Sequence, residues 1–181
     1  KPVVLTYSQR SSDRASSDAR LNLVCAARMA ISNIAEVMLV GHANENDEFC
    51  YALSATKVRK MHTSRRDAFR PINTSPIAIV YKDKIDALSS YNLKSDKKVK
   101  LENGFSDKIA LVQFYPGQDP SILDFYLENK YKGIVIESSG LGHVLTDGKN
   151  NWIPKIKKLI KSNISVCFAP QTIYGRLDPL V

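Results

Sequence analysis

Short apolar runs recur along the chain between polar stretches, a pattern that is typical of an α/β protein. Residues 3–7 predict a short buried strand, residues 8–16 a polar loop, and residues 36–40 a second strand. Between the two strands, apolar residues at helical spacing predict a helix with Asp18 in its first turn that runs to about residue 32. A strand, a helix and a strand in this order predict a right-handed crossover in a parallel sheet.

Two further apolar runs follow in the first half. Residues 49–55 alternate in character and predict a hairpin with the strand that leads into Arg59, and residues 77–80 predict another strand. The chain then becomes polar and rich in lysine and serine over residues 83–106, which we interpret as a linker with room for one edge strand.

A second strand and helix pattern fills residues 107–181. Residues 109–114, 133–137 and 164–168 predict strands. Helices are predicted from Asp119, with proline at the first helical position, to about residue 129, and over residues 152–160. The prediction is thus an α/β protein with two small three-layer domains and mainly parallel sheets, residues 1–82 and residues 107–181.

Function in parallel sheets gathers in the loops that follow the carboxyl ends of the strands. In the first half, these loops are residues 8–13 and residues 41–47.

Composition excludes several classes of protein. An apolar content of 44% and a charged content of 24% exclude a wholly disordered chain. No apolar run reaches the roughly 20 residues that span a bilayer, so no membrane role is expected. The net charge of +8 permits an anionic partner such as RNA without identifying one. The three cysteines are widely spaced, and we interpret Cys25, Cys50 and Cys167 as small buried side chains of a protein in the reducing cytoplasm.

The most distinctive stretch is the basic run TKVRKMHTSRRDAF at residues 56–69. If its first part is extended, Val58 and Lys60 share one face, and an apolar Val58 predicts that this face is buried. Lys60 would then point inward, where an ammonium group needs a carboxylate partner. The alternative interpretation is a solvated basic face or a phosphate-contacting patch.

Other candidate residues give weaker signals. His42, His62 and His143 lack the spacing of metal ligands, so no metal site and no cofactor are expected. His42 and His143 each follow a strand, where either could line a site or be a hydrogen-bonded structural residue. Ser8 also follows a strand but lacks a nucleophile elbow, which favours a positioning or structural role. The glycines at positions 140 and 142 indicate a tight turn rather than a dinucleotide site.

Longer motifs resemble those of a known family. The run at residues 56–69, together with SQRSSDRASSDA from Ser8, is similar to the L-asparaginase family, and within it to the D subunits of archaeal glutamyl-tRNA(Gln) amidotransferases. Later motifs agree: FYPG at residues 114–117, GIVIE at 133–137, GLGH at 140–143 and YGR at 174–176. The resemblance extends over nearly the whole chain and implies an asparaginase-like fold.

The resemblance implies an amidohydrolase in which a threonine attacks a side-chain amide and ammonia is released. The family's catalytic lysine falls on Lys60, which would be held by an aspartate and would assist deprotonation of the threonine. The family's substrate contact falls on Ser8, whose backbone would hold the substrate amide. Asp13, Arg14 and Asp18 match a loop that supports the site.

The sequence departs from the family pattern at several positions. Neither of the family's threonine motifs, TGGT and TDT, occurs within the 181 residues, and we expect them upstream of Lys1. Tyr7 stands where the family has glycine before its Ser-Gln pair. Residues 53–55, 138–139 and 169–172 also differ from the family motifs. These changes are compatible with a diverged site.

Three hypotheses follow. The first is part of an amidotransferase component that releases ammonia from glutamine or asparagine for amidation of Glu-tRNA(Gln), with the E subunit of the amidotransferase and tRNA as partners. On this hypothesis the given chain lacks the nucleophile and is catalytically incomplete. The second is part of a free-standing L-asparaginase. The third is a non-catalytic assembly or tRNA-contacting protein that keeps the fold. Because sites of this family form between subunits, a homodimer is implied.

Overall fold

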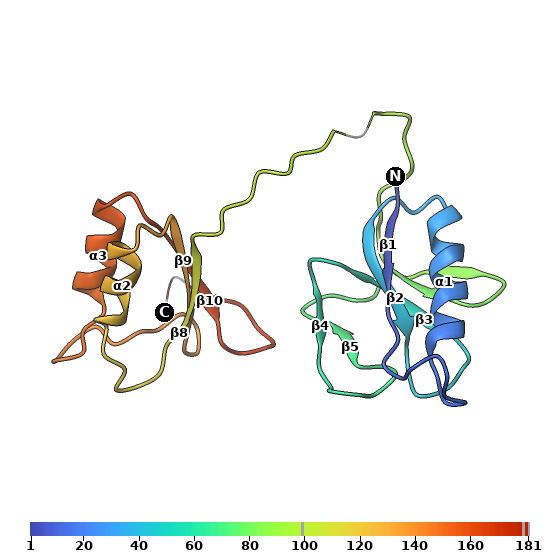
Figure 1. The fold of residues 1–181 in the computed structure, drawn as a ribbon, viewed down its shortest axis with the longest axis horizontal. Helices are drawn as coiled ribbons and strands as arrows, with labels where there is room; N and C mark the ends of the chain where they lie inside the picture. Colours follow the sequence, from blue (N-terminus) through green and yellow to red (C-terminus); the bar gives the residue numbers. More distant parts are fainter. Residues whose placement is uncertain (99, 179, 181) are drawn as a thin grey trace. The chain divides into compact units, whose positions relative to one another are not determined.

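The computed structural model describes residues 1–98, 100–178 and 180. The chain divides into two compact units, residues 1–100 and residues 101–181, and each is described by itself. Figure 1 shows that each unit has strands and helical structure of its own, with α1 in the first unit and α2 and α3 in the second. Among the described residues, no helix is long and apolar enough to cross a membrane.

The first unit is built on a mixed five-stranded sheet with the order β1-β2-β3-β6-β7. Its strands are β1 (Val3–Thr6), β2 (Val37–His42), β3 (Cys50–Ser54), β6 (Ala78–Val80) and β7 (Ile85–Ala87). β1 and β2 pair in parallel, with Val3 opposite Val37 and Thr6 opposite Val40, which confirms the predicted parallel pairing of these two strands. The other neighbours pair antiparallel. The carboxyl ends of β1 and β2 therefore lie at the same end of the sheet, where the loops that follow these two strands begin.

Helix α1 (Ala19–Ile31) connects β1 to β2 and covers one face of this sheet (Figure 1). Its inner face buries Leu21, Cys25 and Met29 against Val40 and other residues of β2, β3 and β6. Asp18 immediately precedes the helix and makes no side-chain cap, contrary to its predicted place in the first turn. Its carboxylate serves the preceding loop instead.

Two predictions for this unit are wrong. The strand at residues 3–7 is not buried, because β1 is an edge strand and Val3 and Leu5 are about half exposed. β3 does not form a hairpin with the strand leading into Arg59. That strand is β4 (Val58–Lys60), which pairs only with β5 (Phe69–Pro71) in a separate two-stranded ribbon. The ribbon has one neighbour per strand and buries neither face fully.

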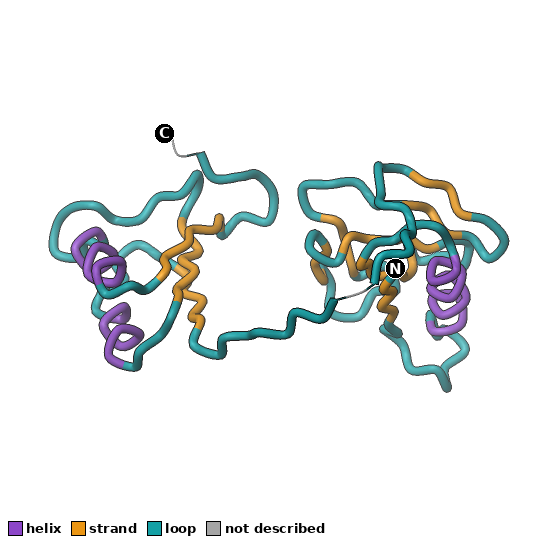
Figure 2. Tube along the Cα trace, turned by 90° about the horizontal axis from the view of Figure 1, so that it is seen from above, coloured by secondary structure: helices purple, strands orange, loops and turns teal. Residues whose placement is uncertain are grey.

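The second unit contains a parallel three-stranded sheet with the order β10-β9-β8. Its elements are β8 (Ile109–Gln113), α2 (Ile122–Glu128), β9 (Gly133–Ser138), α3 (Ile153–Lys161) and β10 (Ser165–Pro170). Both helices lie on the same side of the sheet, as Figures 1 and 2 show. The α/β class and its parallel sheet are thus confirmed here, while the predicted third layer is not found among the described residues.

The core of this unit surrounds its single tryptophan. Trp152 is fully buried, and its ring meets the ring of Phe114 edge to face at a centroid distance of 5.3 Å. Ile136 and Leu159 are buried around them. Cys167 is exposed, which corrects its prediction as a buried residue, because it lies on the strand face away from the helices. Cys25 and Cys50 are buried as predicted.

Candidate functional site

The loop that begins at Ser8 is held by the buried carboxylate of Asp18. The backbone N–H groups of Gln9 and Arg10 donate to this carboxylate at 3.0 Å, and the Ser8 hydroxyl approaches its Oδ1 at 3.2 Å. The Ser8 hydroxyl also donates to the carbonyl oxygen of Arg10, and Ser8 itself is exposed. The role of Asp18 as a support for this loop is therefore visible in the structure.

Asn22, one turn into α1, connects this loop to β2. Its Nδ2 donates to the carbonyl oxygen of Tyr7 at 3.0 Å and to Asp18 at 3.1 Å, and these two acceptors orient the amide. Its Oδ1 therefore faces Nδ1 of the buried His42 at 2.6 Å, and the Cys50 thiol donates to the same oxygen at 3.4 Å. Asn22 is fully buried and has an acceptor or donor for each of its polar atoms.

His42 continues the network into the loop after β2. Its Nε2 lies 2.9 Å from Asp47 Oδ1, and the same oxygen accepts a hydrogen bond from Arg66 Nη1 at 2.9 Å. Arg66 also donates from Nη2 to the carbonyl oxygen of Glu45, and its backbone N–H donates to the Glu45 carboxylate at 3.2 Å. The loop after β2 and the basic stretch are thus joined by charge-assisted hydrogen bonds.

A second carboxylate organises the basic stretch itself. Asp67 is buried and accepts two hydrogen bonds from Arg65, at 2.8 and 3.1 Å, and one from Arg70. Arg65 also approaches Glu45 at 3.5 Å. The arginines of this run are therefore largely committed to internal ion pairs, so most of them do not form the free basic patch that the charge pattern alone would suggest.

The environments of these carboxylates favour their ionised forms. Burial raises the pKa of Asp18, but the hydrogen bonds from Gln9 and Arg10 outweigh it and the net shift is downward. The hydrogen bond with His42 is the main cause of the lowered pKa of Asp47. For Asp67, hydrogen bonds and charge from its arginines outweigh the opposing effect of burial and lower the pKa. The network is therefore anchored by carboxylates that stay charged well into the acidic range.

Lys60 ends strand β4 and is exposed, so the predicted inward orientation is wrong for this chain. The physical reason is that β4 belongs to the two-stranded ribbon rather than to the covered sheet. Its ammonium lies 5.9 Å from the centroid of the Phe69 ring, a cation–π contact worth roughly 0.5–1 kcal/mol at an exposed position. Among the described residues it forms no ion pair with a carboxylate. It lines an open hollow of about 410 Å³ with Met61, His62 and Thr63.

Tyr7 directly precedes Ser8. It lies between the Ser8 loop and the two-stranded ribbon of β4 and β5. Its ring lies 4.5 Å from the Phe69 ring, centroid to centroid, and its hydroxyl donates to the carbonyl oxygen of Arg66 at 3.2 Å. Burial is the main cause of a raised pKa for this hydroxyl, which therefore stays protonated and able to donate. The two predicted site residues are thus brought together indirectly, because Tyr7 adjoins Ser8 and Phe69 pairs with Lys60.

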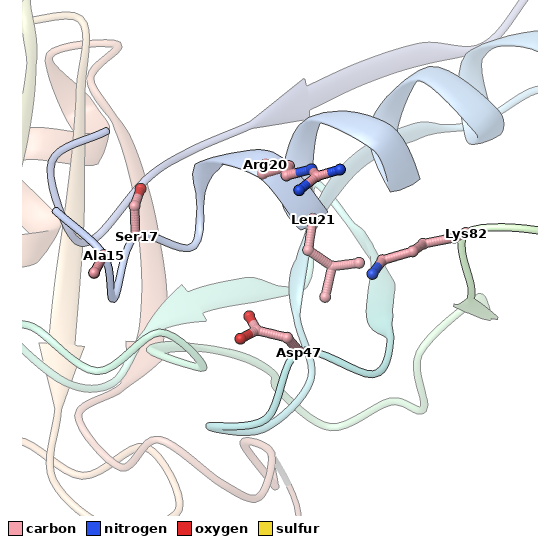
Figure 3. Close-up of a pocket in the computed structure, with 6 residues that line it drawn as sticks. All are labelled: Ala15, Ser17, Arg20, Leu21, Asp47 and Lys82. Carbon is pink, nitrogen blue, oxygen red and sulfur yellow. The ribbon is translucent and has the colours of Figure 1, made fainter. Parts of the chain in front are cut away.

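A second hollow lies beside the first turn of α1 (Figure 3). It has a volume of about 310 Å³ and is lined by Ala15, Ser17, Arg20, Leu21, Asp47 and Lys82. Figure 3 shows the Lys82 side chain extending toward Leu21, while Asp47 lies below Leu21 on a separate loop. Since Asp47 also belongs to the hydrogen-bond network, this hollow adjoins the network from the side of the helix.

The other sequence candidates have structural surroundings. His62 is exposed, and its Nδ1 accepts hydrogen bonds from the backbone N–H groups of Ser64 and Arg65 at 3.1 Å. His143 closes a tight turn in the second unit, where its backbone N–H donates to Ser139 at 2.9 Å. Both glycines of that turn have positive φ, as the tight-turn interpretation requires. Within the part of the chain that the structure describes, no cluster of three or more His, Cys, Asp or Glu is placed to hold a metal ion.

Sequence reasoning missed Asn22, Asp47 and Asp67 as parts of the site. Asn22 carried a usable signal, since it is a polar residue on the buried face of an apolar helix, where burial requires a partner. Asp47 ends the predicted functional loop at residues 41–47 and Asp67 lies within the basic stretch, but nothing singled out either residue, because their partners are distant in sequence or belong to a turn whose shape the pattern does not predict.

Two protein families match the chain. The family described as "Asparaginase, N-terminal" matches residues 1–92, and the family described as "Glutaminase/Asparaginase C-terminal domain" matches residues 108–181. Together these matches include nearly the whole chain.

Curated relatives with high identity are archaeal proteins. The D subunit of glutamyl-tRNA(Gln) amidotransferase from Pyrococcus furiosus is 50% identical over 180 residues, which are 98% of this chain and 40% of that protein. The protein of the same name from Methanosarcina acetivorans is 45% identical over 178 residues, 97% of this chain and 41% of that protein. The chain therefore spans about 40% of the length of these curated relatives.

Solved structures of L-asparaginases share the fold. The thermostable L-asparaginase from Thermococcus kodakarensis superposes with a TM-score of 0.77 at 25% identity, over 98% of this chain and 51% of that one. A probable cytoplasmic L-asparaginase from Campylobacter jejuni gives the same TM-score at 23% identity, over 98% of this chain and 57% of that one, and shows the fold alone.

Proposed function

Because the chain belongs to the asparaginase family, we propose that it is part of an amidohydrolase subunit that releases ammonia from glutamine or asparagine. In the complete protein this ammonia is used to amidate Glu-tRNA(Gln), as the names of its archaeal relatives suggest. Such a protein acts in the cytoplasm with a partner, the E subunit of the amidotransferase, and with tRNA.

One observation carries the proposal. The Ser8 loop and the ribbon that bears Lys60 are distant in sequence, yet both are fastened to the same buried network at the carboxyl ends of β1 and β2. This edge is where α/β proteins of this type place their sites.

The proposed reaction has two steps. A threonine hydroxyl attacks the side-chain amide carbon, its proton is passed to the amide nitrogen, the C–N bond breaks, and ammonia leaves as an acyl intermediate forms; water then hydrolyses this intermediate to the acid and restores the threonine hydroxyl. Lys60 assists the removal of the threonine proton through its ammonium or amine, held by an aspartate of the complete site. The Ser8 backbone holds the substrate amide, and the bonds from Gln9 and Arg10 to Asp18 fix that backbone.

The chain itself contains neither family threonine motif, so the proposal predicts that it is catalytically incomplete. Purified residues 1–181 are expected to release no ammonia from glutamine or asparagine, because a lysine without the nucleophile cannot form the acyl intermediate. The full-length protein is expected to release ammonia from at least one of them. A coupled ammonia assay on both proteins makes the comparison, and turnover by residues 1–181 alone would refute the assignment of the nucleophile.

A free-standing L-asparaginase is the second candidate, because the Thermococcus kodakarensis structure, at 25% identity, bears that name. Since sites of the family form between subunits, both candidates are proposed to act as homodimers. Co-purification separates them. The amidotransferase component should retain a partner protein and bind Glu-tRNA(Gln) with it, whereas an asparaginase should hydrolyse asparagine without any partner. Steep salt dependence of tRNA binding by this chain alone, without turnover of the full-length protein, would instead favour the non-catalytic tRNA-contacting protein.

A further inference from the structure

Two aromatic rings link the Ser8 loop to the strand that bears Lys60, and the proposed chemistry uses neither of them. We propose that Tyr7 and Phe69 are positioning residues, which set the Lys60 ammonium relative to the Ser8 loop. This inference rests on the proposed function and adds to it the device that holds the lysine before substrate arrives.

The first step is the pairing of Lys60 with Phe69. The two residues are directly opposite each other in the antiparallel ribbon of β4 and β5. Directly opposite residues of an antiparallel pair project their side chains from the same face, close enough to touch. The Lys60 ammonium accordingly lies above the Phe69 ring, 5.9 Å from its centroid, where the negative face of the ring attracts it.

The second step is the contact of Phe69 with Tyr7. The ring centroids are 4.5 Å apart and the ring planes are inclined by 43°. The Tyr7 hydroxyl donates to the carbonyl oxygen of Arg66, three residues before Phe69, so Tyr7 holds the turn of the basic stretch at two points. Because Tyr7 directly precedes Ser8, a displacement of the ribbon is passed to the Ser8 loop through one peptide unit.

The third step is the packing of the Tyr7 ring against Gly41 of β2. A Cβ placed on Gly41 would lie 2.3 Å from Cε1 and Cζ of Tyr7, a separation that real atoms do not reach. The tyrosine therefore occupies the space that any side chain at position 41 would need. Tyr7 is a large residue, and the neighbouring Gly41 makes room for it.

The physical consequence is a preset position for an otherwise mobile side chain. An exposed lysine samples many rotamers, and the aspartate proposed to hold Lys60 in the complete site is not among the described residues; within them, the ammonium contacts the Phe69 ring. The two rings are stiff, since each has only two side-chain torsions, and they restrict the ammonium to one side of the ribbon. Misplacement of a catalytic group by about 1 Å can lower a rate by roughly 100-fold, so such restriction matters for kcat.

The first test needs no catalytic activity. In residues 1–181 with 13C-labelled lysine, the ε-methylene resonances of Lys60 should be shifted upfield by ring currents relative to those of the exposed neighbour Lys57. The shift should vanish in Phe69→Leu and decrease in Tyr7→Ala and Gly41→Ala, while Tyr7→Phe should keep most of it. Gly104→Ala is the matched control, because an added Cβ there meets no atom within 4 Å.

The second test measures glutamine hydrolysis by the full-length protein. Tyr7→Ala and Gly41→Ala should lower kcat by about 10- to 100-fold with little change in KM, and Tyr7→Phe should restore most of the rate. The double variant Tyr7→Ala with Gly41→Ala should lose little more than Tyr7→Ala alone, because both changes remove the same contact.

The outcomes separate this inference from the proposed function. Unshifted Lys60 resonances in the unaltered chain, or a shift that survives Phe69→Leu, would overturn the positioning role whatever the activity. Normal kcat in Tyr7→Ala, in a protein that Lys60→Ala inactivates, would overturn the positioning role and leave the proposed function intact. If the full-length protein hydrolysed no glutamine, the proposed function would be wrong. The ring-current shift of the Lys60 resonances would still show whether Lys60 contacts Phe69.

Discussion

Replacement of Lys60 by alanine in the full-length protein is expected to lower kcat for ammonia release by about 1000-fold, within the roughly 100- to 10,000-fold range of general acid–base groups. In residues 1–181, where Lys60 is exposed and makes no described ion pair, the same change should leave the free energy of unfolding within about 0.5 kcal/mol of the unaltered chain. A large loss of rate without a loss of stability is the signature of a residue that is present for chemistry.

Two further variants sharpen this prediction. Lys57→Ala removes an exposed lysine from the same basic stretch and should keep the normal rate. Lys60→Arg keeps the positive charge but cannot release a proton, so it should restore little of the rate if Lys60 takes part in proton transfer. A Lys60→Ala protein whose kcat stays within threefold of normal would remove Lys60 from the proposed mechanism. The measurement is steady-state kinetics with glutamine and with asparagine, alongside thermal unfolding.

The second large effect is expected at Asp18. Its replacement by alanine removes the acceptor of the Gln9 and Arg10 N–H groups and of the Asn22 amide, all at buried or half-buried positions. Each unsatisfied donor costs about 1–3 kcal/mol, so the first unit should lose roughly 3 kcal/mol or more of its free energy of unfolding. Asp13→Ala, an exposed carboxylate in the same loop, should change it by less than about 0.5 kcal/mol.

The two units allow an internal control for the Asp18 experiment. Trp152 is the only tryptophan and is buried in the second unit, so its fluorescence follows that unit. Urea unfolding monitored by amide signals of α1 should shift to lower urea in Asp18→Ala, while the fluorescence transition should stay in place. If the α1 signals of Asp18→Ala unfold at the normal urea concentration, the carboxylate is not the anchor of the Ser8 loop.

The stabilising effect of Asp18 has a defined dependence on pH. Because the folded state lowers the pKa of Asp18 below its unfolded value of about 3.9, its contribution is fully present above that value. The contribution is lost as the pH falls through the lower pKa of the folded state. The stability difference between the unaltered chain and Asp18→Ala should therefore be constant from neutral pH to about pH 5 and should shrink below about pH 4. A difference that grows on acidification would contradict the direction of the shift.

Much of the fold follows from local pattern. The apolar runs of β2, β8 and β9 and the periodic apolar positions of α1 and α3 repeat over enough residues to define their elements. The pairing of β4 with β5 did not follow, because both strands have three residues and carry too little pattern to select a partner. A strand leading into Arg59 was predicted and is present as β4, but the exposure of Lys60 at its end depends on the pairing of β4 with β5.

The candidate site was likewise predictable only in part. Ser8 and Lys60 were found through motifs whose residue types and order are specific to a family. The bonds that tie them together were not, because the contacts of Asn22 with His42 and of Asp47 with Arg66 join residues about 20 positions apart and follow no period. Tyr7 was noticed only as a departure, and its contacts with Gly41 and Phe69 show what the larger residue does.

Release of ammonia from glutamine for the amidation of Glu-tRNA(Gln) is the central proposal, and the fate of the amide nitrogen tests it most directly. The full-length protein, with its partner amidotransferase protein, ATP and Glu-tRNA(Gln), is supplied with glutamine that carries 15N in the side-chain amide. Mass spectrometry of the amino acid released from the tRNA should show glutamine labelled with 15N, and Lys60→Ala should abolish the label. Normal labelling by the Lys60→Ala protein, or unlabelled tRNA while the glutamine is hydrolysed, would contradict the proposed role.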